Sequence, residues 1–177
     1  MDWQSWHSFY PPPVQTNIIY PMEQYEVVDG IVNGLIQINN DRIAGYERAT
    51  NDAGVLDTDI KATFKGMIRQ SKANKDELSK YVRKIDDVVG DETTISGNIY
   101  QAWMDIKGGF APVDRHSILE SCEFAEDAAQ RAYASALNAA DLHDEAVRQV
   151  IASQKASLKI SQDLIKAQRN AHRAPKK

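Results

Sequence analysis

Four acidic residues fall within eight positions of the chain and could together bind a divalent cation. They are Glu120, Glu123, Glu126 and Asp127, in the segment 118–137, ILESCEFAEDAAQRAYASAL. His116 precedes Glu120 by four positions, so on a helix the two side chains could share one metal ion. The same spacing is typical of a helix whose charges face water. The spacing of the apolar residues around these acids helps to distinguish a metal site from a solvated face.

The apolar pattern divides these acids into two groups. On a helix, positions three and four apart form the stripe that faces the protein core. In this segment the stripe contains Leu119, Cys122, Glu126, Ala129, Tyr133 and Ala136. Glu126 therefore points inward, whereas Glu120, Glu123, Asp127 and His116 follow the edge of the stripe, where we expect a solvated face.

Helical spacing extends over most of the remaining chain. Apolar residues recur every three or four positions over 25–51, over 60–85, over 114–139, and in a last segment that begins near 141 or 143. No alternating apolar and polar run of the kind that forms a strand occurs between turn signals. The sequence therefore predicts an all-α fold.

The lengths of the links predict how the helices connect. Short turns near residues 54 and 141 favour two antiparallel hairpins, and the link of roughly 25 residues between the second and third helices can travel the length of a bundle. This crossover makes the second and third helices parallel. Its segment ISGNIYQAWMDIKGGF predicts a short extra helix. The expected architecture is a ferritin-like four-helix bundle.

Polar residues interrupt all four apolar stripes at a similar depth. Counting from the two short turns places these residues at one level: Arg42, Ser71, Asn74, Glu126, and Gln154 or Ser157. Because an unpaired buried carboxylate is costly, we expect Arg42 to neutralise Glu126. Ser71, Asn74 and Gln154 would satisfy the remaining donors and acceptors. The sequence thus predicts a buried polar layer that sets the helix register.

A two-metal site at this depth would need other residues. Ferritin-like bundles build it from carboxylates on two helices and a Glu-x-x-His pair on each of the other two, but this chain contains no Glu-x-x-His sequence. We therefore favour a layer without metal or other cofactor. The alternative is a reduced site for iron, manganese or zinc, using Glu126 and Glu123 with Glu120 or His116.

Composition argues against several classes of protein. The net charge of −4 does not suit a nucleic-acid-binding protein, which needs a clustered basic face. No apolar run reaches the roughly 20 residues that span a membrane. Cys122 is the single cysteine, which fits a reducing compartment and a cytoplasmic protein. Its place on the core stripe predicts a small buried side chain rather than a nucleophile.

The two ends of the chain differ from the bundle, which we assign to residues 23–168. Residues 1–22 form an arm that gathers Trp3, Trp6, Phe9, Tyr10 and Tyr20 around residues 11–13, which are all proline. The arm could dock on the bundle or on a second subunit; alternatively it is a frayed extension and translation begins at Met22. Residues 169–177 form a basic tail, which we expect to be solvated.

Three motifs resemble those of a small bacterial family of ferritin-like domains of unknown function. They are DRIAGY at 41–46, WMDIK at 103–107 and HSILESCEFAEDAAQRAY at 116–133. The resemblance covers roughly residues 25–168 and implies a ferritin-like fold in a family without an established activity. This chain has Ala44 where the family motif has an acid, and Gln162 where the last helix often carries histidine.

These observations lead to two hypotheses about function. The first is a non-catalytic bundle that acts as an interaction or stress-associated scaffold, for which a homodimer is one arrangement. The second is a ferritin-like metalloprotein with the reduced carboxylate site described above. We expect no catalytic residues.

Overall fold

A computed structural model describes residues 22–54, 57–82 and 114–171, and these residues form helices without any strand. The helices are α1 (Met22–Asp52), α2 (Thr58–Leu78), α4 (Arg115–Leu137) and α5 (Glu145–Ala171). The all-α prediction is therefore confirmed for this part of the chain. The aromatic arm up to residue 21, the short helix expected in the crossover, and residues 172–177 of the basic tail lie outside it. No helix within the described ranges is long and apolar enough to cross a membrane.

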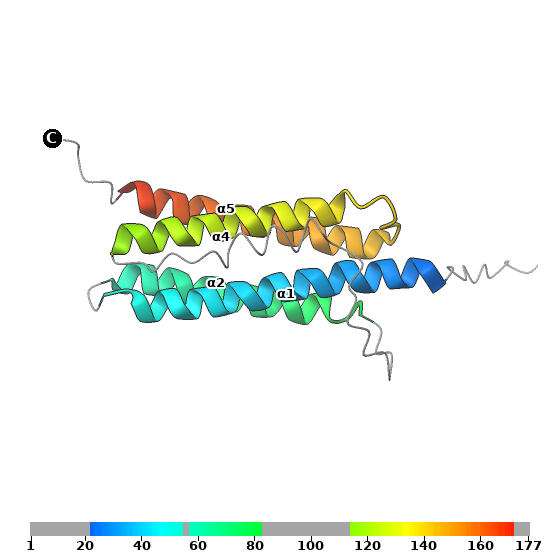
Figure 1. The fold of residues 1–177 in the computed structure, drawn as a ribbon, viewed down its shortest axis with the longest axis horizontal. Coiled ribbons are helices and arrows are strands. Elements are labelled where there is room, and N and C mark those ends of the chain that lie inside the picture. Colours follow the sequence, from blue (N-terminus) through cyan, green and yellow to red (C-terminus); the bar gives the residue numbers. More distant parts are fainter. Residues whose placement is uncertain (1–21, 55–56, 83–113, 172–177) are drawn as a thin grey trace, which may run out of the picture.

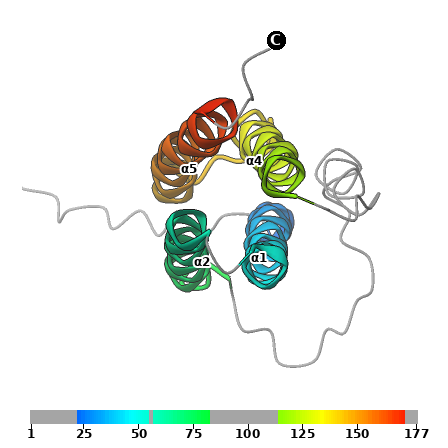
Figure 2. The same ribbon diagram turned by 90° about the vertical axis from the view of Figure 1, so that its left-hand side faces the viewer.

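The four described helices pack side by side as a bundle. Viewed from its end, α1 lies between α2 and α4, and α5 lies between the same two helices on the opposite corner (Figure 2). The colours of Figure 1 show that α1 and α5 run in one direction along the bundle and α2 and α4 in the other. The second and third long helices are thus parallel, as the long link between them predicts.

Capping groups explain where the helices begin. The Asp114 side chain accepts a hydrogen bond of 2.8 Å from the Ser117 amide and caps α4. The Asp144 side chain accepts one of 3.0 Å from the Val147 amide. The last helix therefore begins at Glu145, later than the expected start at 141 or 143.

The second helix ends earlier than its apolar pattern predicts. It stops at Leu78, where the backbone turns and the Tyr81 amide donates to the Leu78 carbonyl at 2.9 Å. Tyr81 still packs against the core from this turn. An apolar residue can thus continue a helical stripe in the sequence without belonging to the helix.

Two apolar clusters fill the bundle, one toward each end. The first is centred on Ile31, Leu35, Tyr133 and Leu158, and the second on Tyr46, Phe64, Leu119 and Ile165. Buried polar residues lie between them: Asn39, Arg42, Ser71, Asn74, Glu126 and Gln154. The core of this bundle is therefore interrupted in the middle.

One aliphatic residue of the last helix is not where its pattern places it. Leu164 continues the apolar spacing of α5, yet it is 44% exposed, whereas its neighbour Ile165 is completely buried. The difference arises because α2 and α5 leave an open groove at this position.

Candidate functional site: a buried polar layer

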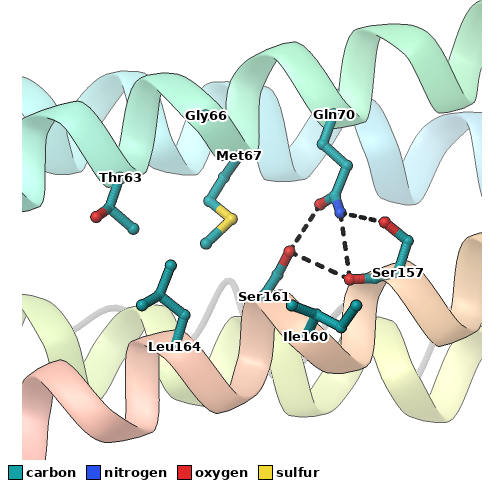
Figure 3. A pocket seen from close by; sticks show the side chains of 8 residues that line it. All are labelled: Thr63, Gly66, Met67, Gln70, Ser157, Ile160, Ser161 and Leu164. Atoms are coloured by element: carbon teal, nitrogen blue, oxygen red, sulfur yellow. Dashed lines mark hydrogen bonds between the residues drawn. The ribbon is translucent and has the colours of Figure 1, made fainter.

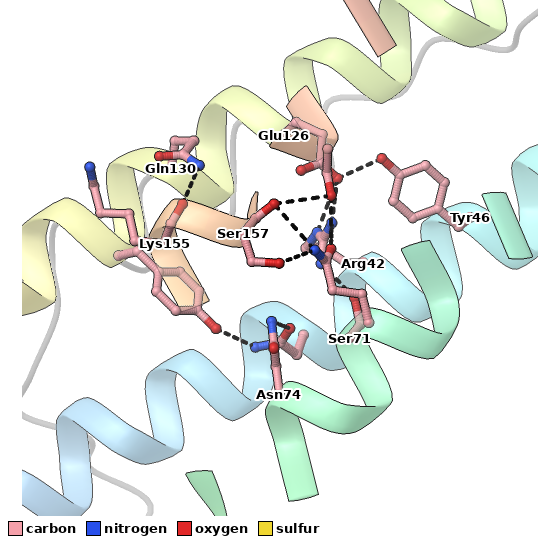
Figure 4. Close-up of polar contacts among 12 residues, drawn as sticks. Arg42, Tyr46, Ser71, Asn74, Glu126, Gln130, Lys155 and Ser157 are labelled. Atoms are coloured by element: carbon pink, nitrogen blue, oxygen red, sulfur yellow. Dashed lines mark hydrogen bonds and ion pairs between the residues drawn. The ribbon is translucent and has the colours of Figure 1, made fainter. Parts of the chain in front are cut away.

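An ion pair between α1 and α4 forms the centre of the polar layer (Figure 4). The Nε and Nη2 atoms of Arg42 donate to Oε1 of Glu126 at 3.0 and 2.7 Å. The two side chains are only 1% and 0% exposed, respectively. Because neither charge reaches water, each depends on the other for its neutralisation.

Two further hydrogen bonds of Arg42 go to residues of α2. Nη1 donates to the Ser71 hydroxyl at 2.6 Å, and Nη2 also donates to the Gln70 side-chain carbonyl at 3.1 Å. Burial by itself would lower the pKa of Arg42, but the charge of Glu126 and the hydrogen bonds to it raise this pKa overall. Arg42 therefore stays protonated and joins three helices at one depth.

Tyr46 completes the surroundings of the carboxylate. Its hydroxyl donates to Glu126 Oε1 at 2.5 Å, and the Arg42 guanidinium lies 5.8 Å from the centre of its ring. Burial and the nearby carboxylate raise the pKa of Tyr46 well above its ordinary value, so the phenol keeps its proton. Three donors thus converge on one oxygen, whereas the buried Oε2 of Glu126 has no hydrogen-bond partner among the residues that the structure describes.

A second polar network lies about one helical turn away and uses all four helices. Asn39 donates to the Tyr133 hydroxyl at 2.8 Å, and this hydroxyl donates to the Gln154 carbonyl at 2.8 Å. Gln154 in turn donates to the backbone carbonyl of Asn74 at 3.3 Å and to Glu77 at 2.8 Å. Burial raises the pKa of Tyr133 to about 12, so this hydroxyl remains a donor.

The structure therefore places the five predicted layer residues in the core but divides them into two groups. Arg42, Ser71 and Glu126 contact one another. Asn74 and Gln154 belong to the second network, so the expectation that they satisfy groups of the ion pair is wrong. The reason is that residues three apart on a helix lie about 4.5 Å apart along its axis, which is enough to separate two layers.

Two of the other acids of α4, Glu123 and Asp127, contact α5. Arg169 forms an ion pair with Glu123, and Lys166 lies 3.5 Å from Asp127. Gln162, the residue at the histidine position of the resemblance, donates to Asp127. This edge is therefore an interface between two helices rather than a free carboxylate cluster.

The candidate metal ligands are not brought together. Glu120 is exposed, Glu126 is buried, and His116 lies ten residues before Glu126, about 15 Å along the helix. Among the residues that the structure describes, no three His, Cys, Asp or Glu side chains come close enough to hold a metal ion.

The polar layer also does not fit the two-metal site that the ferritin-like resemblance implies. Hard cations need several oxygen or imidazole ligands that are free to coordinate. Here a guanidinium and a phenol already bind one oxygen of Glu126, and the facing residues are Ser71 and Gln70. The positive charge of Arg42 stands where a cation would have to lie.

Sequence reasoning missed the polar role of several layer residues. Tyr133 belongs to the apolar stripe of the segment 118–137 and Tyr46 lies within the helical segment 25–51, yet their hydroxyls donate to Glu126 and Gln154 in the polar layers. Gln70 lies outside the predicted layer, and it accepts bonds from both Arg42 and Ser161. One usable signal was that tyrosines lie on stripes that also contain polar residues, since a buried hydroxyl needs a partner.

Comparison with known proteins identifies a family but gives no activity. The model of the family described as "Domain of unknown function (DUF2383)" matches residues 29–139, which include the polar residues of α1, α2 and α4 but none of α5. No curated protein and no solved structure matches the chain. Since the matched span is more than half of the 177 residues, the chain belongs to the DUF2383 family, a domain of unknown function.

Proposed function

We propose that this protein is a non-catalytic, ferritin-like helical scaffold whose polar middle layer sets the helix register instead of holding metal. The observation that carries the proposal is that Arg42 and Tyr46 both donate hydrogen bonds to the Glu126 carboxylate. In a ferritin-like bundle the carboxylates at this depth must be free to coordinate. Here the buried carboxylate of Glu126 instead accepts hydrogen bonds from other side chains of the protein.

The direction and connection of the helices support the ferritin-like part of the proposal. Two hairpins are joined so that α2 and α4 run parallel, which is the arrangement that one long crossover produces (Figure 1). Glu126 lies near the middle of α4 and faces the centre of the bundle. A bacterial origin of the family is a further part of this proposal.

A role in setting register follows from the energetics of buried polar groups. A one-turn slide of α1, α4 or α5 would separate Arg42 from Glu126, or Tyr133 from Gln154, and leave buried groups without partners. A slide of α2 would remove Ser71 from Arg42. Such groups cost about 1–3 kcal/mol each when neutral, and more when charged. The layer therefore selects one alignment among several that an apolar core alone would tolerate.

Metal binding is the second candidate, and one observation favours it. Oε2 of Glu126 is buried and, within the described part of the chain, has no hydrogen-bond partner, so it could coordinate a cation such as iron, manganese or zinc. Arg42 opposes this function, because its charge would repel the cation. The scaffold is the better supported function.

Elemental analysis of protein purified without a histidine tag distinguishes the two functions. The scaffold proposal expects no stoichiometric iron, manganese or zinc, and a thermal midpoint unchanged by a chelator. Near-stoichiometric metal that is lost in Glu126→Gln but kept in the exposed control Glu47→Gln would overturn it.

Three further properties belong to this proposal: a cytoplasmic location, a stress-associated role and the binding of partner proteins. A cytoplasmic location is supported by the single, buried thiol of Cys122, which suits a reducing compartment. A stress-associated role and binding of partner proteins follow from the scaffold hypothesis. A bacterial strain that lacks the protein should then grow normally and lose viability under oxidative or osmotic stress. Equal survival of the two strains would contradict this role.

A further inference from the structure

A groove between α2 and α5 exposes the apolar side chains of Ile160 and Leu164, which do not pack in the core of the bundle (Figure 3). Gly66, Met67 and Gln70 contribute to one wall, and Ile160 and Leu164 to the other. Its volume is about 280 Å³, close to the lower end of small-molecule sites, which begin near 300 Å³. The groove therefore suits one or two large side chains.

The exposure of this surface is unusual for the part of the chain that the structure describes. Its exposed large apolar side chains are Phe124, Ile160 and Leu164, and two of the three line the groove. Ile160 is 72% exposed and precedes Leu164 by one turn on the same face of α5. Adjacent exposed aliphatics mark a surface that another segment covers.

Gly66 keeps the groove open. A Cβ atom at this position would meet nothing closer than the end of the Arg69 side chain, at 3.9 Å. Packing within the bundle therefore does not require glycine here, although glycine in a helix costs about 1 kcal/mol relative to alanine. The missing side chain leaves room for a ligand side chain beside Met67.

We propose that the groove binds the N-terminal arm of the same chain, with Trp3 and Trp6 as its anchors and Tyr10 beside its near end. These aromatic residues are spaced by three and four positions, the spacing of anchors in a segment that fills a helix groove. The lining residues of α2 and α5 repeat at the same interval. From Trp3 to Met22 the chain has no Asp, Glu, Lys or Arg, so this arm can be buried without stranding a charge.

The length of the arm agrees with this position. Arg42 bonds to Gln70, so the near end of the groove lies level with Arg42, which is 20 residues or about 30 Å along α1 from Met22. The 11 residues 11–21 include four prolines and, at about 3.1 Å each, are long enough to span about 34 Å. With a sideways offset of about 10 Å between neighbouring helices, Tyr10 is still within reach of Gln70, and the residues before it are long enough to cover the groove.

A tethered segment also has an advantage over a second copy of the protein. A short linker holds its ligand at an effective concentration in the millimolar range. A separate chain at micromolar concentration competes poorly with it. The inference does not depend on whether the polar layer is free of metal.

Tryptophan fluorescence in the full-length chain tests the proposal. In a Trp103→Phe background the two remaining tryptophans, Trp3 and Trp6, both belong to the arm. We expect blue-shifted emission and weak quenching by acrylamide. Ile160→Lys should shift the emission to longer wavelength and increase quenching several-fold, whereas the matched control Phe124→Lys should change neither.

A second pair of variants fills the groove without adding charge. Gly66→Leu should release the arm, and Gly45→Leu on the exposed face of α1 should not, since neither position has a neighbour within 3.9 Å of a new Cβ. Circular dichroism and the urea midpoint establish that each variant is folded. Emission typical of exposed tryptophan in the parent, or protection unchanged by both groove variants, would overturn the proposal.

Light scattering across a dilution series separates binding within one chain from binding between two. The proposal expects a monomer whose emission does not change with concentration. A dimer that dissociates together with the loss of tryptophan protection would mean that the arm of a second copy occupies the groove.

Discussion

Glu126→Ala is expected to destabilise the bundle strongly, because it leaves the buried guanidinium of Arg42 without its counter-charge. The substitution removes two hydrogen bonds from Arg42 and one from Tyr46, and only the bonds to Ser71 and Gln70 remain. Breaking a buried ion pair on one side costs about 3–5 kcal/mol. Urea denaturation followed by circular dichroism measures this loss.

The double-mutant cycle with Arg42→Met isolates the ion pair. Each single substitution strands one charge and should cost about 3–5 kcal/mol. The double variant has no stranded charge and should cost only about 1–3 kcal/mol, mainly because Tyr46 loses its acceptor. We therefore expect a coupling free energy of at least about 3 kcal/mol.

An exposed pair in the same bundle provides the control. Lys159 and Asp163 form an ion pair one turn apart on α5, and both side chains are more than half exposed. Their cycle, with Lys159→Met and Asp163→Ala, should give a coupling of about 0.3–0.5 kcal/mol. If the Arg42–Glu126 cycle is additive to within about 0.5 kcal/mol, the reasoning about the layer is refuted.

Three further predictions concern other parts of the structure. Tyr133→Phe should lower the free energy of unfolding in urea by about 1–3 kcal/mol, because the hydroxyl joins two buried partners; a neutral effect would contradict the second network. The hydrogen bond from Arg115 lowers the pKa of Asp59, so this contact should stabilise the protein above about pH 4 and lose its effect as the pH falls further. The difference in thermal midpoint between the natural chain and Arg115→Gln should therefore shrink below pH 4, and a constant difference would argue against the contact. Burial raises the pKa of Cys122 to about 12, so its thiol should react with a disulfide reagent at pH 8 only after unfolding in urea, and reaction of the native protein would disprove its burial.

Periodicity predicted the existence of the helices better than their ends. The apolar stripe of α1 identified a helix that the structure extends from Met22 to Asp52. The start of α5 was placed too early because several polar residues before Glu145 could act as caps, and only the bond between Asp144 and the Val147 amide shows which one does. Helix ends depend on single hydrogen bonds, whereas a stripe is repeated over many residues.

The position of Glu126 was predictable, but its complete set of partners was not. A carboxylate on an apolar stripe requires a counter-charge, and Arg42 is the basic residue at the matching depth. That Tyr46 also donates to the carboxylate depends on how α1 is rotated against α4. Likewise, Asn74 and Gln154 lie near the predicted depth, but their hydrogen bonds belong to the second network and not to the ion pair. A difference of one helical turn decides which side chains are close enough to bond.

The sequence by itself determined that the chain forms four long helices, that Glu126 faces inward, and that the second and third helices are parallel. These features follow from periodicity and link length, which are local properties of the chain. Only the tertiary structure decided that the polar residues form two layers and that Leu164 and Ile160 remain exposed beside Gly66. The physical reason is that hydrogen bonds and grooves depend on the rotation and spacing of neighbouring helices to within a few ångströms.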